Sequence, residues 1–153
     1  MVLENTYNSQ WSRQLSVHLP KHARQSWTRL KQLADRNGDG VTTSAEAADA
    51  DAIALLQRAG IPLIDDTEDG SRGSGLMHHK FIVIDGLQLL TGSANATSSG
   101  IHGDAGAANS RGNVNHLLSI RSQELADLFR QEFQRMWGDG PGGKKDSQFG
   151  LAK

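Results

Sequence analysis

The stretch Met77 to Asn95, MHHKFIVIDGLQLLTGSAN, decides how the second half of this 153-residue chain folds. Phe81 to Ile84 is apolar and rich in β-branched residues, and Gln88 to Thr91 follows closely as a second strand candidate. Asp85 and Gly86 stand between them, and Asp-Gly is a typical two-residue turn of a β-hairpin. The stretch therefore predicts a strand, a tight turn and a second strand.

A two-residue turn also predicts which side chains of this hairpin share a face. It sets Lys80 opposite Thr91 and His78 opposite Ser93. Because strand side chains alternate between faces, these four would lie together, and Asn95 follows two residues further on. An imidazole, an ammonium, two hydroxyls and an amide would converge at the open end of the hairpin. That set suits a bound oxyanion, with a histidine placed to attack its central atom.

The same residues carry a resemblance to a known family. Their order and spacing resemble the HKD signature of the phospholipase D superfamily, through His78, Lys80, Asp85, Gly92, Ser93 and Asn95. The resemblance implies an α/β fold in which a mixed sheet is flanked by helices. It also implies an active site built from two HKD copies. This sequence shows one copy, so the second would come from a homodimer or from a missing part of a longer chain.

The resemblance implies two-step cleavage of a phosphodiester bond in a phospholipid or a nucleic acid. His78 would attack phosphorus and form a phosphohistidine, and the matching histidine of the second copy would protonate the leaving oxygen and then activate water. Three further groups, from Lys80, Ser93 and Asn95, would hold the phosphoryl oxygens. Asp85 has the opposite strand parity to His78 and is interpreted as a turn residue of the motif. No metal is needed for this chemistry.

One position departs from the pattern of the resembled family. There, a strand that follows the motif tends to begin with an acidic residue that orients the catalytic histidine. The nearest matching position in this sequence is Asn115. An amide can accept a hydrogen bond but cannot stabilise an imidazolium as a carboxylate does. This favours a second hypothesis, in which the chain is a catalytically silent calcium-binding or dimerisation module. The intact His78 and Lys80 favour the enzyme.

A second motif, DRNGDGVTTSAE, occupies Asp35 to Glu46 and resembles an EF-hand calcium loop. Gly40 stands where such a loop turns sharply, and the oxygen ligands would be Asp35, Asn37, Asp39, the carbonyl of Val41, Thr43 and Glu46. Calcium takes six to eight oxygen ligands, and this spacing would wrap them around one structural ion. The alternative is a helix-breaking Asn-Gly-Asp-Gly turn, capped by Thr43 or Ser44, without metal.

The remaining patterns fill in the fold. Helical periodicity predicts helices over 21–34, 45–59 and 122–137, the last capped by Ser122 and with an apolar face of Leu125, Leu128, Phe129, Phe133, Met136 and Trp137. Strands are expected at 1–4, 61–64 and 116–120. We therefore expect a phospholipase D-like domain over 1–137, with the EF-hand-like helix-loop-helix inserted at about 24–59, and a Gly-rich tail or linker over 138–153. The polar segments 65–75 and 96–113 would border the open end of the hairpin.

Composition excludes few functions. The formal net charge is −1, so the chain as a whole lacks the basic footprint of a nucleic-acid-binding protein, although a local patch would suffice. The chain has no cysteine, which excludes disulfides and thiolate zinc sites. No apolar run is long enough to cross a bilayer, and the first residues do not resemble a secretory signal. The compartment cannot be predicted. An incomplete strand at Met1 and the linker-like end favour half of a two-copy protein.

Overall fold

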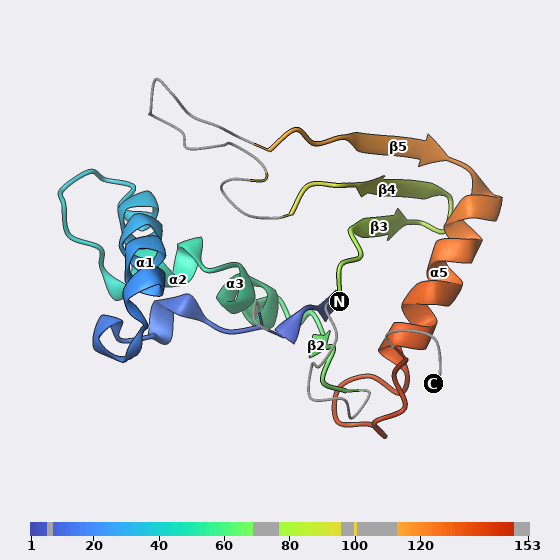
Figure 1. Cartoon of the computed structure of the whole chain (residues 1–153), viewed down its shortest axis with the longest axis horizontal. Helices are drawn as coiled ribbons and strands as arrows, with labels where there is room; N and C mark the ends of the chain where they lie inside the picture. Colours follow the sequence, from blue (N-terminus) through green and yellow to red (C-terminus); the bar gives the residue numbers. More distant parts are fainter. Residues whose placement is uncertain (6–7, 69–76, 96–99, 101–112, 149–153) are drawn as a thin grey trace.

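A computed structural model of the chain describes residues 1–5, 8–68, 77–95, 100 and 113–148. Helices α1 to α3 lie at one end of the molecule, and strands β3, β4 and β5 with helix α5 lie at the other (Figure 1). The short strands β1 and β2 lie between these two groups. The structure thus combines helices and sheet, as the sequence predicts.

The first group is a helix-loop-helix followed by a third helix. α1 spans Lys21–Ala34 as predicted, and Ala34 at its end is fully buried. The predicted single helix over 45–59 is wrong, because two helices, α2 (Ser44–Ala50) and α3 (Ala52–Arg58), occupy that region. Asp51 separates them: its backbone is extended, and its side chain accepts hydrogen bonds from the amides of Ile53 and Ala54. Asp51 therefore ends one helix and caps the next.

A small parallel ladder links the start of the chain to the region after α3. β1 (Val2–Leu3) pairs with β2 (Ile64–Asp65), Val2 with Ile64 and Leu3 with Asp65. The strand expected at 61–64 begins only at Ile64. Pro62 explains the delay, because it has no amide to donate to a ladder. Its carbonyl instead accepts a hydrogen bond from the Met1 amino group at 2.7 Å.

The hairpin forms where the sequence predicts it, with a different register. β3 spans Phe81–Ile84 and β4 spans Gln88–Gly92, but Phe81 pairs with Thr91 and Ile84 with Gln88. The predicted pairing of Lys80 with Thr91 and of His78 with Ser93 is therefore wrong by one residue. Because side chains alternate along a strand, the predicted shared face is wrong too. The register places Thr91 and Ser93 on the face of Phe81, opposite to that of Lys80 and His78.

Leu87 causes this shift. Asp85 and Gly86 do form the turn, with φ of 51° and 64°, the left-handed backbone that such turns require. The Leu87 amide closes this turn by donating to the carbonyl of Ile84 at 3.1 Å, as a two-residue turn requires. The Leu87 carbonyl, however, accepts from the Ser122 amide at 3.0 Å instead of from Ile84, and Gln88 is the first residue of β4 to pair.

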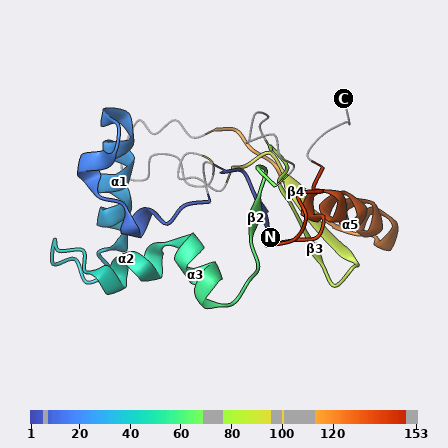
Figure 2. The same cartoon turned by 90° about the horizontal axis from the view of Figure 1, so that it is seen from below.

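The third strand and the last helix complete this half of the molecule. β5 (Leu117–Arg121) pairs antiparallel with β4, giving the order β3-β4-β5. Ser122 then caps α5 (Gln123–Trp137) by accepting a hydrogen bond from the Leu125 amide, as predicted. The helix packs against β3 and β4 (Figure 2). The cap therefore turns the chain from the edge of the sheet onto its face.

The core under α5 is small. Leu89, Ala126 and Met136 are 2% exposed or less, and the rings of Phe81 and Phe129 meet edge to face at 5.0 Å. Leu128 was expected on the packed face, but it is 54% exposed. The opposite face of the sheet keeps Ile82 59% exposed. Within the described residues, one face of the sheet is thus covered by a helix.

Two further findings qualify the predicted architecture. The described strands form a parallel pair and an antiparallel triplet rather than one mixed sheet. The segment 138–148, expected to be a loose tail, turns back on α5: Gln148 donates to the carbonyl of Arg135 at 2.8 Å, and Ser147 is buried. In the described part of the chain, no helix combines the length and apolar character needed to span a membrane.

Candidate active site

His78 and Lys80 lie just before β3, at the open end of the hairpin. The His78 side chain is exposed, and the Lys80 ammonium donates to the backbone carbonyl of His78 at 2.7 Å. Partial burial lowers the pKa of Lys80, because desolvation disfavours the charged form. His79 points to the other face, where it lies 3.8 Å from Glu132 of α5 and edge-on to Phe81. His79 is also exposed, but α5 borders it, whereas within the described residues no side chain bonds to the His78 ring.

The second part of the motif begins at Gly92, the last residue of β4, and packing explains why this residue is a glycine. A Cβ on Gly92 would lie 2.3 Å from the carbonyl oxygen of His116, because β5 approaches closely there. Ser93 continues this contact: its amide donates to the His116 carbonyl, and its hydroxyl accepts from the His116 amide, both at 3.1 Å. A larger residue at position 92 would separate these strands.

Asn115 contacts Ser93 rather than the histidine that its family position would orient. The Ser93 hydroxyl donates to Asn115 Oδ1 at 3.1 Å, and Asn115 Nδ2 donates to the carbonyl of Gly100 at 2.8 Å. Within the described residues, no hydrogen bond joins Asn115 to His78. Asn115 therefore acts on the second part of the motif. The pairing of Ser93 with the start of β5 was not predicted, since it depends on strand order rather than on local sequence.

The structure brings the five predicted catalytic residues only partly together. His78 and Lys80 meet the end of β4 through the backbone, because the Gly92 amide donates to the Lys80 carbonyl at 3.3 Å. Thr91 donates its hydroxyl to the same carbonyl at 3.0 Å. Asn95 is exposed beyond β4. Asp85 lies in the turn at the opposite end of the hairpin, which fits its interpretation as a turn residue.

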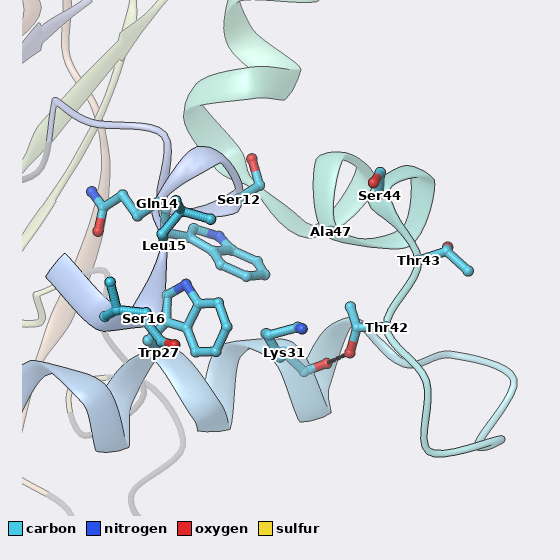
Figure 3. A pocket seen from close by; sticks show the side chains of 12 residues that line it. Ser12, Gln14, Leu15, Ser16, Trp27, Lys31, Thr42, Thr43, Ser44 and Ala47 are labelled. Carbon is cyan, nitrogen blue, oxygen red and sulfur yellow. Dashed lines mark hydrogen bonds between the residues drawn. The ribbon is translucent and has the colours of Figure 1, made fainter. Parts of the chain in front are cut away.

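A surface cavity lies elsewhere in the described structure. It has a volume of about 300 Å³ and is lined by residues before α1, by α1 itself and by the start of α2 (Figure 3). The motif residues at the open end of the hairpin do not line this cavity. The segments 69–76, 96–99 and 101–112, which include most of those expected to border this end, lie outside the described residues. The chemistry of the motif, not the cavity, therefore identifies the candidate active site.

The loop between α1 and α2 turns at two glycines with positive φ. Gly38 and Gly40 have φ of 71° and 80°. The Asp35 carboxylate accepts from the amides of Gly38 and Gly40 at 2.9 and 2.8 Å, and Asp39 Oδ1 accepts from the amide of Val41 at 2.7 Å. In the same way, Asn37 Oδ1 accepts a hydrogen bond from the backbone amide of Asp39 at 2.9 Å. The loop carboxylates thus hold the loop together.

The end of this loop forms a capping box. The Thr43 hydroxyl accepts from the Glu46 amide, and the Glu46 carboxylate accepts from the amide and hydroxyl of Thr43 at 2.9 and 2.8 Å. These hydrogen bonds lower the pKa of Glu46. The oxygen donors suit a hard cation. As the described side chains lie, however, no three acidic or histidine groups are close enough together to hold a metal ion.

The comparison with protein families identifies the fold family of this hairpin. A family profile described as "Cardiolipin synthase, PLD-like domain" matches residues 13–137. The chain belongs to this PLD-like family. The match covers the hairpin, β5 and α5, and it also includes the helix-loop-helix of α1 and α2.

Similarity to individual proteins points in the same direction. The chain is 37% identical to the mitochondrial cardiolipin hydrolases of Canis lupus familiaris, Mus musculus and Homo sapiens over 91 residues, which are 60% of this chain and 30%, 35% and 31% of those proteins. The match thus spans about a third of the length of these curated relatives. No solved structure matches the chain.

Proposed function

We propose that this chain is a phospholipase D-like phosphodiesterase acting on a phospholipid. The observation that carries the proposal is the open end of the hairpin, where an exposed imidazole and a partly buried ammonium stand before β3 and the Gly-Ser-x-Asn segment follows β4. Membership of the PLD-like family and the similarity to cardiolipin hydrolases support this reading and favour a lipid over a nucleic acid.

The chemistry begins with His78. A neutral imidazole nitrogen attacks phosphorus, the bond to the leaving alcohol oxygen breaks, and a phosphohistidine forms. A second histidine gives its proton to that oxygen and then takes one from water, which attacks phosphorus and releases His78. Lys80, Ser93 and Asn95 stabilise the charge on the phosphoryl oxygens. The lowered pKa of Lys80 fits a group that gains by pairing with an anion.

The second histidine comes from another HKD copy, either in a homodimer or in the rest of a longer protein. The side chains at the open end of the hairpin support this, because within the described residues none of them makes a hydrogen bond to the His78 ring. If the second copy comes from a homodimer, activity per chain should rise with protein concentration as dimers form. Sedimentation that shows a fully active monomer would contradict the need for a second copy.

The decisive experiment traps the covalent intermediate. The protein is mixed briefly with a phospholipid labelled at phosphorus, quenched at alkaline pH to preserve phosphohistidine, and digested to locate the label. We expect the label on His78, and none in His78→Ala. Label on another residue, or turnover with no label in the parent, would refute the proposed mechanism. Cleavage of a labelled oligonucleotide but not of the lipid would move the substrate to nucleic acid.

A second candidate function is calcium binding, either beside the chemistry or in a catalytically silent module. The loop from Asp35 to Glu46 supports it, because two glycines with positive φ shape the loop between two helices, and the atoms that would ligate the ion are all oxygens. Asn115 in place of a carboxylate supports the silent module. Binding requires the three loop carboxylates to converge on the ion, with Asn37, Thr43 and the carbonyl of Val41 completing the shell.

Thermal unfolding tests this second candidate. Calcium should raise the melting temperature by mass action on the folded state, and Glu46→Ala should abolish the rise. Asp49→Ala is the matched control, since Asp49 lies on the exposed side of α2, outside the loop. An equal rise in both variants, or none in the parent, would exclude this site. Calcium removal should leave the phosphoryl transfer step unchanged.

A further inference from the structure

Basic residues are concentrated in the segment before the calcium-like loop of Asp35 to Glu46. The segment Trp11–Ala34 contains five basic residues and no acidic one, although the whole chain has a net charge of −1. The basic residues are Arg13, Lys21, Arg24, Arg29 and Lys31. Arg13 and Lys21 are exposed. The segment therefore carries a local excess of positive charge that the composition of the whole chain conceals.

Large apolar side chains are exposed within the same segment. Leu15 and Val17 are 62% and 71% exposed, around the short helix η3 (Ser16–His18). Together with Trp11, Trp27 and Lys31, they line the cavity of about 300 Å³ described above (Figure 3). Of the basic residues, Lys31 therefore lies on the same surface as Leu15 and Val17, and Arg13 lies between Ser12 and Gln14, which also line it.

Hydrogen bonds hold this surface in place. The amide and hydroxyl of Ser12 donate to the buried carboxylate of Asp51 at 3.0 and 2.7 Å, and Arg24 donates to the carbonyl of Leu19 at 2.9 Å. The Lys31 ammonium lies 4.8 Å from the centre of the Trp27 ring. Leu15 and Val17 thus project from a segment that is fixed at both ends, so presenting them costs little further conformational entropy.

We propose that this basic segment docks on an anionic phospholipid bilayer. Leu15 and Val17 enter the boundary between headgroups and acyl chains, and the basic side chains contact lipid phosphates. Nucleic acid would also attract the positive charge, but the exposed apolar side chains that line the cavity, Leu15 and Val17, are aliphatic and offer no stacking platform for bases. Trp11 and Trp27 are half-buried. The inference extends the proposed function, since it places the protein on the surface where a phospholipid substrate lies.

Vesicle sedimentation tests the docking without relying on catalysis. His78→Ala protein in EDTA is mixed with vesicles of phosphatidylcholine alone, or of phosphatidylcholine and phosphatidylglycerol in equal amounts. We expect binding to the anionic vesicles, release by added salt, and weak binding to the neutral ones. Because the protein is a nucleophile variant, a failure of docking leaves the proposed activity standing, and an inactive parent leaves the docking result valid.

Paired variants locate the surface. Arg13→Gln with Lys21→Gln should weaken partition onto anionic vesicles about 25-fold, roughly fivefold for each charge. Leu15→Ser with Val17→Ser should weaken it about tenfold or more. The matched controls, Lys144→Gln with Lys145→Gln and Leu128→Ser, change exposed residues elsewhere and should leave it unchanged.

Three results would overturn the proposal. The first is that the protein with an unaltered basic segment binds neutral and anionic vesicles equally, or binds neither. The second is that the variants in the basic segment bind anionic vesicles as well as the control variants do. The third is retention of an RNA oligonucleotide, lost in Arg13→Gln with Lys21→Gln, by a protein that does not bind vesicles. That outcome would assign the surface to nucleic acid.

Discussion

The hairpin at β3–β4 and the loop between α1 and α2 each carry a motif, but they use its side chains differently. At the hairpin, backbone ladders hold the fold, while His78 and Asn95 are exposed. In the loop, the motif side chains bond to the loop itself: Asp35 to two glycine amides, and Glu46 to Thr43.

This difference predicts what each motif needs. In the part of the chain that the structure describes, no side chain bonds to the His78 ring, and the proposed function would complete this site with a substrate and a second HKD copy. Carboxylates that already accept hydrogen bonds from their own loop stabilise it without an ion. Changes of the exposed side chains in the hairpin motif should therefore act mainly on chemistry, and changes around the loop mainly on stability.

The largest effect is expected for His78→Ala compared with His79→Ala. Loss of a covalent nucleophile should lower turnover of a fluorescent phospholipid on the order of 10⁴-fold or more, because no neighbouring group can replace it. His79→Ala removes an imidazole packed near Phe81 and Glu132, so it should cost about 1 kcal/mol of stability and leave most of the turnover.

The pair is its own control for folding, since the two residues are neighbours in sequence on opposite faces. Melting temperatures of both variants should lie close to that of the parent. Inactive His79→Ala with active His78→Ala would show that the active face of the hairpin is the one covered by α5.

The second prediction concerns the close approach of β5. Gly92→Ala places a Cβ 2.3 Å from the His116 carbonyl oxygen, so the strands must separate. We expect a loss of about 3 kcal/mol in unfolding free energy, measured with urea. Activity should fall too, because Ser93 is held by the same strand. Gly86→Ala is the comparison: it meets open space and costs only its positive φ, about 1 kcal/mol. Equal losses of unfolding free energy in the two variants would show that β5 moves away from position 92 at little cost.

Local signals predicted the elements of the fold well, because they depend on neighbours in sequence. α1 begins and ends where its periodicity predicts, and Ser122 caps α5. The Asp-Gly turn forms, but the register beyond it depends on Leu87, whose carbonyl is taken by Ser122 more than thirty residues away in sequence. Such a contact cannot be read from a hairpin signal.

The same limit applies to the site. Spacing alone brings the motif residues to the open end of one hairpin, and the PLD-like family was recognisable from it. It does not show that Asn115 bonds to Ser93, which depends on β5 pairing with β4. The break at Asp51 was missed for a similar reason: the residue is polar on a predicted helix, and only its burial against Ser12 reveals its role.

The third prediction uses that residue. Asp51 is 1% exposed and accepts hydrogen bonds from Ser12, Ile53 and Ala54. Asp51→Ala leaves these donors unpaired and removes the cap of α3, so stability should fall by about 2 kcal/mol. Asp49→Ala, which removes an exposed ion pair with Arg58, should cost about 0.5 kcal/mol. Similar losses in urea unfolding would mean that Asp51 is not a structural anchor.

The smallest effect should come from the capping box at Glu46, and pH reveals it. Hydrogen bonds from Thr43 lower the pKa of this carboxyl below its ordinary value of 4.5, although the nearby charge of Asp39 opposes them. A carboxyl with a lowered pKa stabilises the fold fully above its unfolded pKa, and this contribution is lost as the pH falls through the folded pKa. Glu46→Gln cannot titrate. In EDTA, the parent should therefore melt slightly above this variant at neutral pH, and the gap should close below about pH 4.5. A gap that stays constant into acid would show that the glutamate charge adds nothing to the cap, and the loop would then depend on Asp35 and Asp39 alone.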